Sequence, residues 1–210
     1  MKKRAFLPAA AAVVLAAALA VGGTYAWLTS RTDPVVNTFT VGNVSITLDE
    51  AQVQKDAAAS TWSAASARVQ QNDYEGIYPG AVLPKDPTVH VAAGSEDALV
   101  YVMLQDALNA AVPGSADYTV GAAWTAVDTA GYAAPSGAAA RVYRFYAAAH
   151  AGDDLVVFDG VTVAETVTAE QMALLDGTIT VTAFAVQANG PDAATADAQA
   201  LAAFGFTKEV

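Results

Sequence analysis

A period-two alternation of apolar and polar residues runs from Thr38 to Asp49. Successive side chains of a strand point to opposite faces, so this pattern predicts a half-buried β-strand and disfavours a helix. The apolar positions change from odd to even at Gly42-Asn43, which predicts a bulge or a tight bend at that point. The same alternation returns at Thr178–Thr182.

Two short runs are apolar at consecutive positions, Ala98–Leu104 and Leu155–Phe158. Each is too short for an isolated helix, and a strand in the middle of a packed sheet carries apolar residues on both faces. Both runs are therefore predicted to be central strands. Turn-forming Gly, Pro and Asp residues separate them from further predicted strands. These further strands are Ala81–Val91, Tyr118–Val127 and Arg141–Ala148.

Helix-like sequence is confined to brief inserts. Thr168 can cap a helix over Thr168–Leu175, and an Asp begins the Ala-rich segment Asp192–Phe204. The Ala/Ser-rich segment Asp56–Gln70 is compatible with a helix or with a mobile loop. With roughly eight strands and a few short helices, the chain is predicted to be all-β, a two-sheet jelly-roll-like sandwich with short helical inserts.

Charge balance and the absence of cysteine limit the chemistry open to this chain. Its 210 residues carry 21 acidic and 10 basic side chains, for a net charge of −11. Such a polyanion repels phosphate backbones and anionic lipid, so no nucleic acid is expected as a partner. Without cysteine there is no disulfide, no thiol nucleophile and no Cys-based zinc site. The length suits one well-buried domain.

Residues 1–26 have the three-part layout of a secretory signal peptide. A basic start precedes an apolar run, and the stretch closes with the small-residue site Thr24-Tyr25-Ala26. Cleavage is expected between Ala26 and Trp27, which would leave a secreted chain with no stable membrane anchor. The alternative is an uncleaved anchor helix, although the apolar run is shorter than the ~20 residues that a bilayer core requires.

No constellation of catalytic or metal-binding residues stands out in the sequence. His90 and His150 are its two histidines, and neither a His-Glu-x-x-His nor a Gly-x-Ser-x-Gly motif is present. Each histidine is therefore interpreted as a surface or strand-end residue. Oxygen-rich turns could bind calcium, but none has the Asp-x-Asp-x-Asp-Gly pattern of a calcium loop, and no cofactor is expected.

The segment Arg141–Tyr146 places arginines beside aromatic side chains. Such a pairing can form a sugar-binding or partner-binding surface. A strand that packs its aromatic residues on one face and stacks Arg on the other explains the pattern equally simply, and this interpretation is favoured.

The order of these features resembles that of the TasA/camelysin family, whose members are cut by a SipW-type signal peptidase. Gly22–Leu28 followed by Asn37–Glu50 looks like the opening of these proteins. Tyr78–Val102 is similar to the family's Pro-Gly turn, Lys-bearing strand and following central strand. The family's later strands also have similar segments in this chain, in the same order: Trp124, Tyr143–Tyr146, Leu155–Val161 and Ile179–Gln187.

The resemblance implies an exported jelly-roll domain that builds biofilm-matrix fibres, or serves them as an accessory subunit, at the cell surface. It implies as partners further copies of the chain or sister matrix subunits, and a dedicated signal peptidase during export. Camelysin relatives carry a metallopeptidase label, so a cell-surface metallopeptidase is the alternative. This chain has no zinc motif, and a non-catalytic role is expected.

Residues 27–36 are expected to form an extended segment ahead of a single β-sandwich domain, 37–210. Pro34 disfavours a helix or a central strand there. A sandwich that lacks an edge strand can accept an extended segment from a neighbour, and the resemblance implies assembly by such strand donation. A disordered remnant of the leader is the alternative. The apolar residues of this candidate donor segment are Trp27, Leu28, Val35 and Val36.

Cleavage after Ala26 can be tested directly, because the basic, apolar and small-residue regions specify one site. The secreted protein is expected to have an intact mass that begins at Trp27. A secreted product that still contained residues 1–26 would contradict this prediction.

Overall fold

The computed structural model describes residues 43–135, 139–175 and 177–209, all within one compact unit of the chain, Val41–Val210. Most of its regular structure is β-strand, and all paired strands are antiparallel. The all-β prediction is confirmed. The described helices are short: α2 (Ala107–Ala111), α3 (Ala169–Met172) and α4 (Ala193–Ala203). No helix in these ranges is long and apolar enough to cross a membrane.

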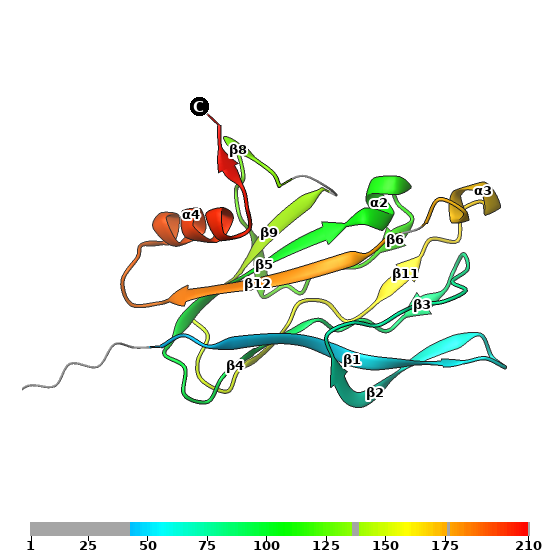
Figure 1. Ribbon diagram of the computed structural model, residues 1–210, viewed down its shortest axis with the longest axis horizontal. Coiled ribbons are helices and arrows are strands. Elements are labelled where there is room, and N and C mark those ends of the chain that lie inside the picture. The colour runs from blue at the N-terminus through cyan, green and yellow to red at the C-terminus, as the bar shows by residue number, and fades with distance from the viewer. Residues whose placement is uncertain (1–42, 136–138, 176, 210) are drawn as a thin grey trace, which may run out of the picture. The chain divides into compact units, whose positions relative to one another are not determined.

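Two four-stranded sheets form the main layers, with strand orders β10-β4-β1-β2 and β12-β5-β9-β7 (Figure 1). The strands of the first sheet are β1 (Ile46–Asp56), β2 (Thr61–Val69), β4 (Thr88–Val91) and β10 (Asp154–Val156). Those of the second are β5 (Ala98–Asp106), β7 (Trp124–Ala126), β9 (Ala140–Phe145) and β12 (Ile179–Gln187).

Two smaller sheets complete the described strands. One has the order β3-β11-β6, and the other pairs β13 with β8. Their strands are β3 (Val82–Leu83), β6 (Ala116–Asp117), β8 (Tyr132–Ala133), β11 (Val161–Val163) and β13 (Thr207–Lys208).

One hydrophobic core joins the two large sheets. The even-numbered residues of β5 from Ala98 to Leu104 enter it, because alternate side chains of a strand share a face. Val89 and Val91 of β4 meet them from the other sheet, and Trp124 of β7 belongs to the same core. The shared core explains why the two sheets stack.

A second core covers the opposite face of the second sheet. Tyr101 and Met103 of β5 pack there against Ala200 and Leu201 of α4 and against Phe204. Figure 1 shows α4 lying over this sheet, on the side away from β1 and β4. Strand β5 is thus buried on both faces and paired on both edges, as its apolar run predicts.

The prediction of a second central strand at Leu155–Phe158 is wrong. Strand β10 lies at the edge of its sheet, and Val156 is exposed. The run is apolar for another reason: Leu155, Val157 and Phe158 are buried in the core. The main chain there also bonds outside the sheet, since the indole Nε1 of Trp124 donates to the Val156 carbonyl oxygen at 2.8 Å.

The segment Asp56–Gln70 is neither helix nor loop over most of its length, because it contains strand β2. Its Ala and Ser side chains are mostly exposed, whereas Trp62 is buried. A strand with so little apolar alternation gains its stability from pairing with β1, a contact that local composition does not reveal.

Other predicted strands are present but shorter. Pro84 and Pro87, which lack a backbone N–H, separate β3 from β4 within Ala81–Val91. Only Trp124–Ala126 of Tyr118–Val127 forms a strand of the second sheet. Strand β9 covers most of Arg141–Ala148.

Both predicted helical inserts are confirmed. Thr168 and Gln171 form a capping box at α3, since each side chain bonds the other's backbone N–H group. At α4 the Asp192 side chain accepts from the N–H of Thr195 at 2.8 Å. These caps satisfy N–H groups that a helix leaves unpaired at its first turn.

The Arg141–Tyr146 segment has aromatic residues on one face and an arginine on the other, as the favoured interpretation predicts. Tyr143 and Phe145 face the inner core, and Arg144 faces α4. Arg144 does not stack on a ring but donates to the Asp197 carboxylate at 2.7 Å, to which the Tyr101 hydroxyl also donates at 2.8 Å. Burial, together with this bond to Asp197, raises the pKa of Tyr101 to about 12.

Replacement of Asp197 by Ala is expected to lower the free energy of unfolding by about 1 to 3 kcal/mol, because it leaves the buried Tyr101 hydroxyl without an acceptor. Urea unfolding would measure the change. In a Tyr101→Phe background, Asp197→Ala should lower the free energy of unfolding by a smaller amount. An equal decrease in both backgrounds would show that the Tyr101–Asp197 hydrogen bond does not contribute to stability.

Candidate functional site

The sequence-predicted cleavage site and donor segment lie outside the described residues. They comprise Thr24, Tyr25, Ala26, Trp27, Leu28, Val35 and Val36. Within the described ranges two features stand out: a polar network across the first sheet, and an open side of the two main sheets. The polar network consists of Asp49, Glu50, Arg68, Asn72, Lys85, Asp86, His90 and Asp154.

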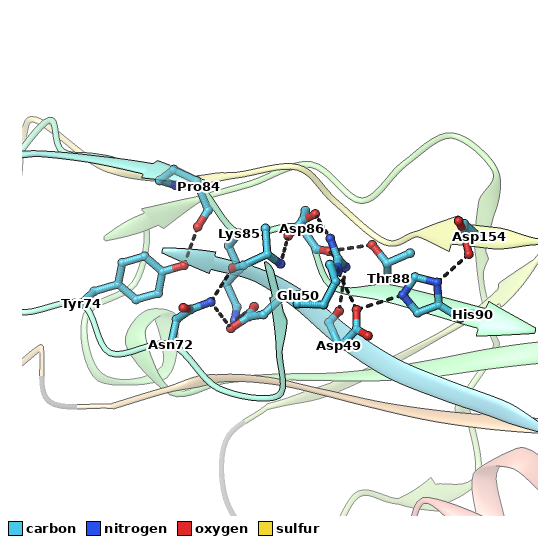
Figure 2. A network of polar contacts seen from close by, with 12 residues as sticks. Asp49, Glu50, Asn72, Tyr74, Pro84, Lys85, Asp86, Thr88, His90 and Asp154 are labelled. Atoms are coloured by element: carbon cyan, nitrogen blue, oxygen red, sulfur yellow. Dashed lines mark hydrogen bonds and ion pairs between the residues drawn. The ribbon is translucent and has the colours of Figure 1, made fainter. Parts of the chain in front are cut away.

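His90 lies at the centre of one branch of the polar network (Figure 2). In the strand register it stands between Asp154 of β10 and Thr47 of β1, and Asp49 lies two residues beyond Thr47. The ring nitrogen Nδ1 meets the Asp154 carboxylate at 2.5 Å, and Nε2 meets the Asp49 carboxylate at 2.9 Å. Both imidazole nitrogens are thereby occupied by carboxylates from two different strands.

Arg68 extends this branch to strand β2. Its Nε donates to Asp49 at 2.7 Å, and its Nη1 donates to the Asp86 carboxylate. The planar guanidinium thus joins two carboxylates in one fixed geometry, which a lysine could not reproduce. A continuous chain of charged contacts runs from β10 through β4 and β1 to β2.

The other branch of the polar network bonds main-chain groups where the β1–β2 hydrogen-bond ladder is interrupted. The register shifts between Ala51 and Val53, as at a β-bulge. Asp86 accepts from the Ala51 N–H at 2.6 Å, and Asn72 accepts from the Val53 N–H at 2.8 Å while donating to the Ala51 carbonyl oxygen at 2.8 Å. Side chains thus replace main-chain partners at the bulge.

Beneath the bulge lies a buried ion pair. Glu50 is 5 % exposed, and its carboxylate meets the Lys85 ammonium at 2.6 Å and the Asn72 amide at 3.0 Å. Removing one partner of such a pair leaves an uncompensated buried charge, which is strongly destabilising. Burial raises the pKa of the nearby Tyr74 hydroxyl, and the charge of Glu50 raises it further.

The ionisation of His90 and Asp49 follows from their contacts. Partial burial alone would lower the pKa of His90, but the bonds to Asp154 and Asp49 outweigh it and raise that pKa. Burial alone would raise the pKa of Asp49, and the bonds from His90 and Arg68 reverse the shift. The arrangement therefore favours the ion pair over the neutral forms.

The bonds of the polar network link β10, β4, β1 and β2, so the network stabilises the pairing of these strands. The carboxylates sit on opposite nitrogens of His90, so these groups do not converge on one point where an ion could bind. His150 has its own partner, the Asp97 carboxylate at 2.8 Å. In the described part of the chain, no group of three or more His, Asp or Glu side chains is placed to hold a metal ion. Both histidines are partly or largely exposed, in agreement with their interpretation as surface residues.

The open side lies along β12, an edge strand of the second sheet (Figure 1). Thr178 accepts from the Ala107 N–H, and Ala188 donates to Asp97, so even-numbered residues of β12 bond to β5. Odd-numbered residues, from Ile179 to Gln187, direct their main-chain groups to the other edge. No strand within the described ranges pairs there.

The first half of β1 has a similar free edge. β4 pairs with Ile46–Asp49, whereas β2 begins to pair only at Glu50. Strand β1 lies across from β12, as Figure 1 shows, and the two come close together. The apolar side chains on this open side are only partly buried against the core; they are Val44, Ile46, Leu48, Ile179, Val181, Ala183 and Ala185.

Comparison of the chain with family models, curated proteins and solved structures found no match in any of the three. The function of the chain is therefore inferred from its sequence and from the geometry of its described residues.

Sequence reasoning named His90 but missed its partners. Asp49 and His90 each occupy a polar position in an alternating strand, which places them on one face once the strands are paired. The pairing itself has no local signal. Arg68 was also missed, because its segment lacks the alternation that predicts a strand.

Replacement of His90 by Gln tests the polar network. The pKa of His90 is raised in the folded protein, so its contribution to stability is complete below the ordinary value of 6.5 and is lost as the pH rises through the raised pKa. His90→Gln is expected to lower the free energy of unfolding by about 1 kcal/mol near pH 6 and by less near pH 9. Urea unfolding over this pH range measures the difference.

His150→Gln is the matched control, because the imidazole of His150 is 65 % exposed and its ion pair is solvated. This control is expected to change stability little at any pH. Equal pH dependence of unfolding in the wild type and in His90→Gln would show that the network does not depend on the charge of His90.

Proposed function

We propose that this chain is an exported structural protein of the cell surface or biofilm matrix, a fibre subunit or fibre accessory that assembles by β-strand donation. In this proposal residues 1–26 are removed during export, residues 27–36 are the donor segment, and the remainder is a jelly-roll-like sandwich. Other copies of the chain, or sister subunits with similar edges, are the partners.

The observation that carries the proposal is the open side between β1 and β12. Two sheets end there with main-chain groups directed outward, over Ile46–Leu48 and over Ile179–Gln187. An extended segment can satisfy such an edge with main-chain hydrogen bonds. Its apolar side chains can also cover the half-buried residues of the core edge, such as Ile46 and Val181.

The sequence of the donor segment is compatible with this site. It has apolar residues at both ends, Trp27 and Leu28 at one and Val35 and Val36 at the other. Donation from one copy to the next is a heterologous contact, because donor and acceptor are different surfaces. Such a contact propagates as a filament unless its rotation closes a ring.

Deletion of 27–36 is expected to give a folded, β-rich monomer that forms no filaments. Electron microscopy would score filaments, and size-exclusion chromatography with circular dichroism would confirm a folded monomer. The substitution Ala183→Pro tests the acceptor side of the same joint. It removes an N–H directed to the free edge of β12 while leaving the bonds to β5, and it should also suppress filaments.

Ala183→Gly is the control for the acceptor, because it also changes the side chain at this position but keeps the N–H. Filaments should persist in this variant. Filaments of unchanged abundance from the protein lacking 27–36 would place the joint elsewhere and contradict the proposal.

A further inference from the structure

Glu50 holds an amine and an amide at one carboxylate. Its Oε2 accepts from the Lys85 Nζ at 2.6 Å, and its Oε1 accepts from the Asn72 Nδ2 at 3.0 Å. The three residues come from different segments, since Glu50 is in β1, Asn72 follows β2 and Lys85 lies between β3 and β4 (Figure 2). Folding therefore places the amine of Lys85 and the carboxamide of Asn72 on the two oxygens of the same carboxylate.

The ion pair in this site is shielded from water. The side chain of Glu50 is 7 % exposed and that of Lys85 is 14 % exposed. Transfer of a proton along their hydrogen bond converts the pair into a carboxylic acid and an unprotonated amine, which is the nucleophilic form of lysine. Exclusion of water also limits hydrolysis as a competing reaction.

Main-chain groups at the β-bulge hold the Asn72 carboxamide. Its Oδ1 accepts from the Val53 N–H at 2.8 Å, and its Nδ2 donates to the Ala51 carbonyl oxygen at 2.8 Å. When a nucleophile attacks a carboxamide carbon, negative charge develops on the oxygen, and a fixed N–H at this distance stabilises that charge. The bulge thus supplies the donor that an attack on Asn72 Cγ requires.

Tyr74 holds the two reacting residues close together. Its hydroxyl donates to the Pro84 carbonyl oxygen. Tyr74 is two residues after Asn72, and Pro84 directly precedes Lys85, so this bond joins the two ends of the segment 72–85. Reactants that are already held in one site lose little further entropy when they react.

We propose that Lys85 and Asn72 join in an intramolecular amide bond, with Glu50 as the proton-transfer group. Lys85 Nζ passes one proton to Glu50 and attacks Asn72 Cγ, while the Val53 N–H stabilises the charge on Oδ1. Glu50 gives that proton to Nδ2 and takes a second one from Nζ, and the Cγ–Nδ2 bond breaks. The departing ammonia takes this last proton and leaves as ammonium. Glu50 is again a carboxylate, and no oxidant or cofactor is consumed.

The new bond would close residues 72–85, which include β3, into a covalent ring anchored beneath the bulge of β1. A covalent cross-link stabilises a fold by restricting the unfolded chain. The cross-link forms within one chain and uses neither the open side nor the donor segment, so it is independent of the proposed fibre assembly.

Mass spectrometry of the purified, denatured protein tests the proposal. The intact mass is expected to be lower, by one molecule of ammonia, than the mass calculated for the chain. Glu75 lies within the proposed ring, so a protease that cuts after Glu75 should leave the peptides that contain Asn72 and Lys85 joined. Trypsin should also fail to cut after Lys85, because its side chain is no longer a free amine.

Two variants separate the chemistry from the ion pair. Lys85→Arg keeps a positive charge opposite Glu50 but has no amine nucleophile, and it is expected to abolish the loss of ammonia. Glu50→Gln removes the proton-transfer group and should slow formation of the bond by about 100-fold or more. Lys55→Arg is the matched control, because the Lys55 ammonium bonds the Glu75 carbonyl oxygen instead of a carboxylate, and the loss should persist.

An intact mass equal to the calculated mass, after incubation of the folded protein at neutral pH, would overturn the proposal without any substitution. So would a loss of ammonia that persists in Lys85→Arg, or one that proceeds at an unchanged rate in Glu50→Gln. Asn189 precedes Gly190 and can lose ammonia by cyclising with it, so a loss that peptide mapping assigns to Asn189 alone would also overturn the proposal.

Discussion

The double burial of β5 is the constraint on which the other layers depend. Its even residues face the core shared with the first sheet, and its odd residues face α4. Main-chain groups in such a position have no access to water, so each must find a partner on a neighbouring strand. β12 and β9 provide those partners in continuous registers. With the main-chain groups of β5 paired in this way, its two apolar faces still have to be covered. The first sheet covers one face and α4 covers the other.

A second constraint acts where β1 changes its partner. Pairing with β4 ends at Asp49, pairing with β2 begins at Glu50, and the bulge between Ala51 and Val53 follows at once. Side chains of Asp86 and Asn72 bond the main-chain groups that the bulge disrupts. Because β2 pairs only from Glu50 onward, the first half of β1 keeps a free edge. The side-chain bonds at the bulge and the free edge of β1 thus both arise where this strand exchanges its neighbours.

Several carboxylates of this acidic chain form ion pairs with specific basic side chains. Arg68, Lys85 and Arg144 each meet a carboxylate, and the first two hold segments distant in sequence against β1. The proposed donor-strand site lies along β1 and β12.

Local sequence determined the fold class, the strand character of β5 and β12, and the two helices with Thr and Asp caps, because alternation and capping act over a few residues. It also predicted that His90 is a surface or strand-end residue, and the side chain is partly exposed. It did not determine β2, the edge position of β10 or the partners of His90. These depend on which strands lie side by side, and pairing between residues far apart in the chain is set by the burial of the whole core. The open side is decided at the same level, since a free edge exists only where strand pairing stops.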